Sequence, residues 1–271
     1  MFQGRVRRSG SLRSIWHRRE RKRRPADLSP STANLIAQPR PVKTPSEANW
    51  QSGDPRTMIR CVVRLATDRG IVFQMSVRAV ERKLRLFFCA CCRLRWDQLP
   101  VATRPVVEVT EQYANGLVNS RQLRAARRVA QAAEPATWPL PMSGGYAPGA
   151  WDATHAIRLA ITATEVHARL RSGNVPDGSP VSAADQVVLL RDLFENPFHP
   201  VAIEQSWLTP TVLTLAHVIQ AERAFDLLPV LGDALQDAGC DSTEVIDHCY
   251  GSGPHTAGCW LVDRLSGWGT V

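Results

Sequence analysis

Cysteine and histidine side chains gather near the end of this chain, between residues 240 and 259. Five of them fall in this segment: Cys240, His248, Cys249, His255 and Cys259. Thiolate sulfur and imidazole nitrogen are preferred zinc ligands, and a structural zinc site needs four ligands around one ion. Gly251, Gly253 and Gly258 would let the segment turn tightly enough to bring these side chains together. The segment is therefore the one candidate metal site that the sequence offers.

The spacing of these candidates differs from that of a zinc finger or ribbon, because the segment has no CxxC pair and His248 directly precedes Cys249. Neighbours at a helix end point about 100° apart, so both rarely reach one ion. We predict Cys249, His255 and Cys259 as ligands, with Cys240 or His248 as the fourth. The irregular spacing favours the alternative, in which the cysteines are small buried apolar residues and the histidines cap or solvate a loop. In that alternative the chain has no cofactor. If these residues do hold a cofactor, the expected one is zinc.

Catalytic patterns are missing from the sequence. It contains no Ser/His/Asp order, HExxH motif, P-loop or GxGxxG. Cys89, Cys91 and Cys92 have no partner base near them in the sequence, which argues against a redox or nucleophilic role. A helical wheel places Cys91 in the core, Cys92 at its border and Cys89 away from it. We therefore assign no catalytic or cofactor-binding residues, and the sequence favours a protein that is not an enzyme.

Charge is distributed unevenly along the 271 residues. Residues 1–24 carry ten Lys or Arg and one Glu, residues 50–150 carry fifteen basic and seven acidic side chains, and residues 151–271 carry six basic and fifteen acidic ones. One interpretation is that residues 1–24 and the Arg-rich helices bind nucleic acid. The other, which needs no external partner and is favoured for that reason, is that the basic and acidic halves neutralise each other within one fold.

Composition predicts a cytoplasmic protein without a membrane partner. The basic N-terminus is not followed by an apolar signal segment, and the longest apolar run, Leu86 to Cys92, is far shorter than the roughly 20 residues of a membrane span. The seven cysteines then suggest free thiols or a metal rather than disulfides.

Hydrophobic periodicity predicts a mainly α protein, a compact multi-helix bundle with up to two helical subdomains. We expect a disordered basic and Pro-rich extension at 1–46, a helical N-terminal part at 47–134, a Pro/Gly linker at 135–150 and a helical C-terminal part at 151–271 that carries the Cys/His/Gly loop. Predicted helices cover part of 56–69, then 78–98, 104–114, 120–133, 152–171, 183–195, 210–224, 226–238 and 242–249. Residues 71–77 could form a short strand or continue a helix.

Several helix ends are marked by their residue types. Ser120 is the expected N-cap of the helix over 120–133. Ser182, with Asp185 three residues later, resembles a capping box. Thr209 followed by Pro210 is a strong helix start, and Gly239 is a stop signal.

Four stretches resemble a bacterial family found in many paralogous copies per genome. They are RKLRLF at 82–87 with CACCR at 89–93; LRDLFENPF at 190–198; WLTP at 207–210 with ERAFD at 222–226; and GPH at 253–255 with GCW at 258–260. The similarity spans about residues 50–265 and leaves out residues 1–46. Family members often have Gly-Pro-Gly-Pro-His where this chain has Gly-Ser-Gly-Pro-His at 251–255. The resemblance implies a fold and a class of protein, and no catalytic residues, since no activity is established for the family.

We therefore expect an interaction or regulatory module without catalytic activity that binds a protein partner. Trp207, Phe198 and Trp260 could anchor such a partner, although burial is the stronger expectation for each of them. A zinc-binding protein that uses the C-terminal loop and a nucleic-acid-binding protein that uses the basic half are the two alternatives.

Overall fold

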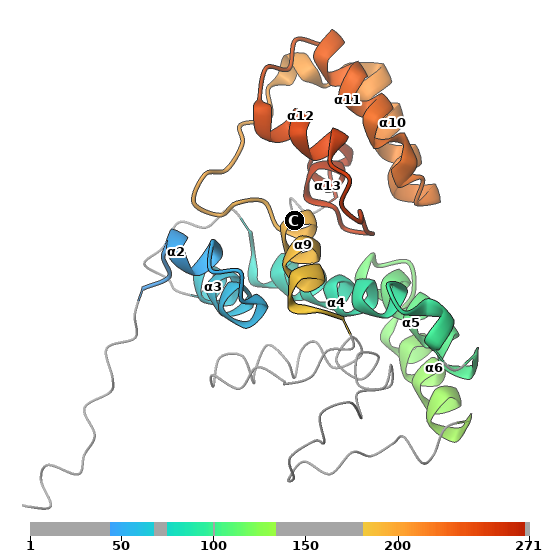
Figure 1. Ribbon diagram of the computed structural model, residues 1–271. Coiled ribbons are helices and arrows are strands. Elements are labelled where there is room, and N and C mark those ends of the chain that lie inside the picture. Colours follow the sequence, from blue (N-terminus) through green and yellow to red (C-terminus); the bar gives the residue numbers. More distant parts are fainter. Residues whose placement is uncertain (1–43, 68–74, 100, 134–180, 269–271) are drawn as a thin grey trace, which may run out of the picture. The chain divides into compact units, whose positions relative to one another are not determined.

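The computed structural model describes residues 44–67, 75–99, 101–133 and 181–268. The chain divides into two units, Met1–Thr44 and Pro45–Val271. Within the described ranges every regular element is a helix, which confirms the mainly α prediction (Figure 1). None of these helices is long and apolar enough to cross a bilayer. The predicted linker 135–150, the predicted helix 152–171 and all but the last three residues of the predicted extension 1–46 lie outside the described residues.

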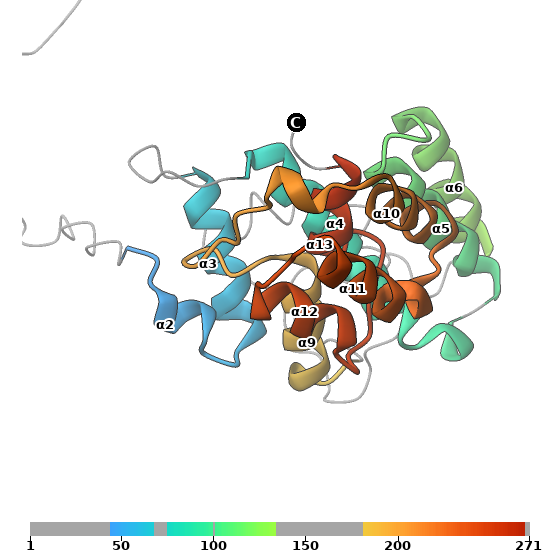
Figure 2. The ribbon, with the colours of Figure 1, turned by 90° about the horizontal axis from the view of Figure 1, so that it is seen from above.

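A first apolar cluster is built by six helices. They are α2 (Glu47–Trp50), α3 (Pro55–Thr67), α4 (Val77–Arg93), α5 (Arg104–Ala114), α6 (Ser120–Ala133) and α9 (Ala183–Leu193). Helix α4 is the central element, because α3, α5 and α9 all pack against it (Figures 1 and 2). Its Leu84 and Phe87 are at most 1% exposed.

Packing on several sides of α4 corrects the prediction for its cysteines. Cys89, Cys91 and Cys92 are all no more than 2% exposed, so Cys89 does not point away from the core and Cys92 is not at its border. The wheel treated α4 as a helix with one buried face, whereas neighbours cover it on more than one side. Burial raises the pKa of Cys89 and Cys92 well above the usual thiol range, so these side chains are packing groups.

A second apolar cluster is formed by the C-terminal helices α10 (Pro210–Glu222), α11 (Leu228–Asp237), α12 (Thr243–Tyr250) and α13 (Trp260–Ser266). Three-residue 3-10 turns at Gln205–Trp207 and Phe225–Leu227 precede α10 and α11. Trp207 and Trp260 are 3% and 7% exposed, so both are buried, as expected. Periodicity in the sequence did not predict α13, which is only seven residues long.

The helix ends test the capping and stop signals that were identified in the sequence. Ser182 and Thr209 accept hydrogen bonds from the backbone N–H groups of Asp185 and Val212, as predicted, and Gly239 adopts φ +87° after α11. The Ser120 cap is wrong: Asn119 Oδ1 accepts from the N–H groups of Arg121 and Gln122, and Ser120 is already helical.

Two other boundaries also differ from the prediction. The helix predicted over 78–98 ends at Arg93, because the Arg95 N–H bonds to the Cys92 carbonyl in a tighter turn that leads into a 3-10 turn at Trp96–Gln98. Val77, at the end of the candidate strand 71–77, is the first residue of α4, and residues 71–74 lie outside the described residues.

Candidate metal centre

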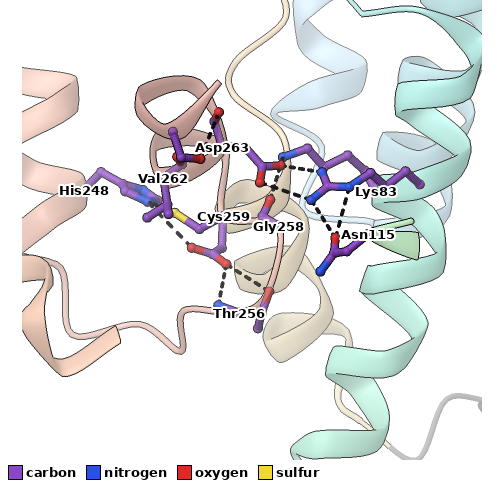
Figure 3. Close-up of polar contacts among 11 residues, drawn as sticks. Lys83, Asn115, His248, Thr256, Gly258, Cys259, Val262 and Asp263 are labelled. Carbon is purple, nitrogen blue, oxygen red and sulfur yellow. Dashed lines mark hydrogen bonds and ion pairs between the residues drawn. The ribbon is translucent and has the colours of Figure 1, made fainter. Parts of the chain in front are cut away.

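A group of potential metal ligands lies where the last helices meet α9. It comprises Asp192 in α9, His248 in α12, His255 in the loop after α12, and Cys259 at the N-cap of α13. One donor atom from each of these side chains lies within 4.8 Å of the other three, so the group could hold a metal ion. Figure 3 shows His248 and Cys259 side by side, with Thr256 on the loop that leads to Cys259.

The spacing of the donor atoms is close to that of a tetrahedral site. The Cys259 Sγ lies 3.0 Å from the His248 Nε2, and the same nitrogen lies 3.6 Å from the Asp192 Oδ1. Around a tetrahedral zinc ion, bond lengths of about 2.0–2.3 Å place neighbouring ligand atoms about 3.4–3.6 Å apart. These two distances lie within about half an ångström of the tetrahedral values, and all four donor atoms lie within 4.8 Å of one another.

His255 is held in an orientation that leaves one nitrogen without a partner. Its Nδ1 donates to the Asp192 Oδ1 at 2.7 Å, since a carboxylate can only accept. The other Asp192 oxygen accepts from the backbone N–H and the hydroxyl of Thr256. In the neutral ring the His255 Nε2 is therefore the unprotonated nitrogen, and it is buried with no hydrogen-bond partner among the described residues. Because Nδ1 is the nitrogen that faces Asp192, an ion held by both residues would bind Nδ1 and would shift its proton to Nε2.

His248 lies between Cys259 and Trp260. The Trp260 indole N–H donates to the Nδ1 at 3.2 Å, so in the neutral ring the proton is on Nε2, which faces the Cys259 sulfur. Binding a metal through Nε2 would move that proton to Nδ1 and end the bond from Trp260. The fluorescence of Trp260 should therefore report on metal binding.

The Cys259–His248 pair is unsuited to act as a nucleophile and its base. Burial raises the pKa of the Cys259 thiol well above its usual range. Burial also lowers the pKa of His248 to about 4. Both shifts oppose a thiolate–imidazolium pair, which a cysteine nucleophile requires. A divalent cation would instead stabilise the thiolate directly.

Gly258 lets the loop pass close to the first apolar cluster. It adopts φ +90°, and a Cβ added there would lie 2.5 Å from the Leu86 Cδ1 and 3.1 Å from the Leu193 Cδ2. Only glycine fits both this backbone conformation and this close approach. The Gly258 carbonyl accepts from the Lys83 Nζ at 2.5 Å, which fixes the backbone beside Cys259.

A buried ion-pair network flanks the group on the side of α4. The Asp263 carboxylate binds both the Lys83 Nζ and the Arg82 guanidinium, and Arg82 also donates to the Asn115 side chain (Figure 3). Lys83 and Asp263 are 4% and 1% exposed. Burial would raise the pKa of Asp263, but the two cations outweigh it and hold that pKa below its usual value. Burial lowers the pKa of Lys83 despite the Asp263 charge.

The structure brings three of the five sequence candidates together and separates the other two from them. His248, His255 and Cys259 belong to the donor group, whereas Cys240 and Cys249 are buried in the second apolar cluster. Burial raises the pKa of Cys249 to about 12. The side chains of His248 and Cys249 diverge along α12, so only one of the pair belongs to the group.

Asp192 was not among the sequence candidates, which were limited to nitrogen and sulfur ligands in one segment. It lies in α9 among Leu189, Leu190 and Leu193, which are fully buried. A carboxylate within such an apolar run needs a partner, because an unpaired buried charge is strongly destabilising. That signal could have indicated a site, although it could not have named the histidines as partners.

Comparison with known proteins gives no match: no family model, curated protein or solved structure matches the chain. The bacterial family resemblance thus stays a prediction, and the interpretation of the site rests on its geometry.

We expect the metal-free protein to lose stability as the pH falls below about 6.5. The pKa of His248 is lowered from 6.5 to about 4, chiefly by burial; Asp192 opposes this shift, and His255 and Lys83 add to it. The unfolded state therefore binds more protons between these two values, and the free energy of unfolding should fall by about 2 kcal/mol between pH 7 and pH 5.

Urea unfolding in the presence of a chelator at these two pH values measures the loss. A His248→Gln variant has no titrating side chain at position 248, so its free energy of unfolding should fall less between pH 7 and pH 5 than that of the parent protein. The same loss in both proteins would contradict this assignment.

Proposed function

We propose that this chain is a non-catalytic helical protein whose C-terminal loop is organised by one zinc ion and which serves as an interaction or regulatory module. One observation carries the zinc part of the proposal. Donor atoms of Asp192, His248, His255 and Cys259 come within 4.8 Å of one another, and the four side chains are buried or nearly so.

The ligand types favour zinc over other common cations. Two imidazole nitrogens and a thiolate are soft or borderline ligands, whereas magnesium and calcium prefer all-oxygen surroundings. Within the group the His255 Nδ1 faces the Asp192 Oδ1 at 2.7 Å, so an ion bound by both residues would replace the hydrogen bond between them. Zinc would also neutralise the Cys259 thiolate, which burial alone disfavours.

A structural role fits this group better than a catalytic one. Four protein ligands fill a tetrahedral zinc ion, whereas a catalytic zinc keeps one position for water or substrate. Asp192 comes from a helix of the first apolar cluster, and His248 and Cys259 come from elements of the second. An ion bound to all of these residues would link the C-terminal helices to α9. A binding surface formed by α9 together with the C-terminal helices would then depend on the metal.

We expect zinc affinity to rise about tenfold per pH unit between about pH 5 and pH 8. The Cys259 thiol keeps its proton in the metal-free protein, because burial raises its pKa, and must release it when the sulfur binds zinc. His248 is already neutral above about pH 4 and exchanges its proton between its two nitrogens. One proton should therefore leave per zinc bound.

Competition with a chelator of known affinity, repeated across this pH range and followed by tryptophan fluorescence, gives the slope. Calorimetry in buffers of different ionisation enthalpy counts the protons released. Affinity that does not change with pH would exclude the thiol as a ligand.

Nucleic-acid binding stays the second candidate because of the arginines of α6. Arg121, Arg124 and Arg128 are exposed at helical spacing along it, and no acidic residue occurs between Ser120 and Ala133. Phosphate contacts from such a face would weaken steeply with added salt, and that dependence is the property to look for.

A further inference from the structure

A cavity of about 590 Å³ lies between α5 and the C-terminal end of α10, with Trp268 forming part of its wall. None of the four donor residues of the candidate metal centre lines it. Its volume falls within the range of about 300–1,000 Å³ that is usual for small-molecule sites. The cavity is therefore separate from the candidate metal centre, and a ligand bound in it would need no zinc.

Two arginines converge on one buried carboxylate at this cavity. The Glu111 side chain is 4% exposed, and it accepts from Arg93 Nε and Nη2 at 3.1 and 2.7 Å and from Arg223 Nη2 at 2.5 Å. These three residues carry a net charge of +1, and Glu108, which also lines the cavity, brings the formal charge of the lining to zero. Arg93 is further held by stacking on the Trp96 ring, 4.0 Å from its centroid.

Both guanidinium groups retain donors for a ligand. Each carries five N–H donors, of which the bonds within the described residues engage two for Arg93 and one for Arg223. Their side chains are 31% and 38% exposed, and both residues line the cavity. Glu111 thus holds a pair of partly free arginine forks in fixed positions, which suits planar or tetrahedral oxyanions.

The backbone of Arg223 is in an unusual conformation for its residue type. With φ +58°, it is the one non-glycine residue with a positive φ in the described part of the chain. It ends α10, a position where glycine is the common choice because it adopts this conformation without strain. Such strain is found preferentially at functional sites, and here it accompanies a side chain that reaches Glu111 and the cavity.

Gln220 supplies an acceptor that needs a donor. Its Oε1 is buried and has no hydrogen-bond partner among the described residues, and Gln220 lines the same cavity. Buried polar atoms are rarely left unpaired in folded proteins. A ligand that carries both oxyanion oxygens and an O–H group would satisfy the arginines and this amide together.

We infer that this cavity is a binding site for a small phosphate-type ligand. The phosphate oxygens accept from Arg93 and Arg223, and a hydroxyl on the ligand donates to the Gln220 Oε1. The Trp268 ring provides an apolar wall for the rest of the molecule. Glu108 also lines the cavity, and its carboxylate acts on Arg93, so it opposes an anion there and recognition depends on the N–H donors of the two arginines.

Inorganic phosphate and sulfate are matched probes for this inference. Both are tetrahedral oxyanions, but at neutral pH phosphate keeps a proton to donate and sulfate does not. Calorimetric titration of the full chain at constant ionic strength should give saturable phosphate binding with a Kd of about 1 mM or tighter. Sulfate should bind at least about five-fold more weakly, because it leaves Gln220 unpaired.

The Arg223→Gly variant isolates the arginine, since glycine suits the backbone conformation and Glu111 keeps Arg93. Phosphate affinity should fall about tenfold or more in this variant. It should stay unchanged in Arg121→Ala, which removes an exposed arginine of α6 and the same charge.

The inference is overturned if phosphate shows no saturable binding up to about 10 mM. It is also overturned if Arg223→Gly binds as well as the parent chain, or if Arg121→Ala weakens binding equally. Equal affinity for the two anions, with loss in Arg223→Gly, would support the arginine site and overturn the role of Gln220.

Discussion

Replacing Cys259 with serine should weaken zinc binding by more than about 100-fold, the largest effect we expect from a single change at the candidate metal centre. A serine hydroxyl does not ionise as a thiol does, and it is a poorer zinc ligand than thiolate. Cys259 is one of the four residues of the donor group, and its sulfur lies 3.0 Å from the His248 nitrogen. Chelator competition on the purified variant measures the change in affinity.

Cys249→Ser is the matched control for this variant. Cys249 is 1% exposed and, like Cys259, belongs to the second apolar cluster, but it is not part of the donor group. Its replacement should leave zinc affinity within a few-fold, although it costs about 1–3 kcal/mol of stability by burying a hydroxyl. Loss of zinc in Cys249→Ser but not in Cys259→Ser would contradict the geometry, and it would also contradict the prediction from sequence, in which both cysteines are ligands.

Replacing Asp263 with alanine should destabilise the fold by about 3–5 kcal/mol. Among the described residues, the change leaves the buried Lys83 ammonium with the Gly258 carbonyl as its hydrogen-bond acceptor, and it removes from Arg82 its carboxylate partner while Asn115 stays in place. Urea unfolding of the metal-free protein, with a chelator present for every variant, separates this loss from any change in zinc binding. If the alanine variant does not fold, Asp263→Asn keeps the shape and tests the charge alone.

Two variants control for this effect. Glu222→Ala removes an exposed acid from the end of α10 and should change stability by less than about 0.5 kcal/mol. The double variant Lys83→Met with Asp263→Leu removes both buried charges and should recover much of the loss, since apolar replacement of a whole buried pair is often neutral. If Asp263→Ala lowers the free energy of unfolding no more than Glu222→Ala does, the ion-pair network contributes nothing to stability.

Local signals in the sequence were sufficient for much of the helical fold. The caps at Ser182 and Thr209 and the stop at Gly239 depend on neighbouring residues, so they could be recognised before the fold was known. Asn119, by contrast, competes with Ser120 for the same helix start, and only the backbone geometry decides between them.

Tertiary packing accounts for the remaining errors. Cys89 was expected to point outward because one helical wheel cannot represent a helix with neighbours on several sides. The short helix α13 has little periodicity of its own. It is held in place by Asp263 and by its buried apolar residues.

The donor group could be predicted only in part from the sequence, because tertiary packing brings one of its residues to the others. His248, His255 and Cys259 lie in one segment and could be proposed together from residue type. Asp192 lies on a helix of the first apolar cluster, and its place beside them results from the packing of α9 against the loop around Gly258. The spacing indicates that His248 and Cys249 rarely bind the same ion, because they are neighbours in the sequence. It does not indicate which of the two faces Asp192.

Elemental analysis of the 271-residue chain, purified without a histidine tag, tests the central claim most directly. We expect about one zinc per chain, removed by strong chelators and reduced to background in Cys259→Ser but not in Cys249→Ser. A folded protein that carries no zinc, and takes up none when the metal is added back at neutral pH, would contradict the proposal that zinc organises the C-terminal loop.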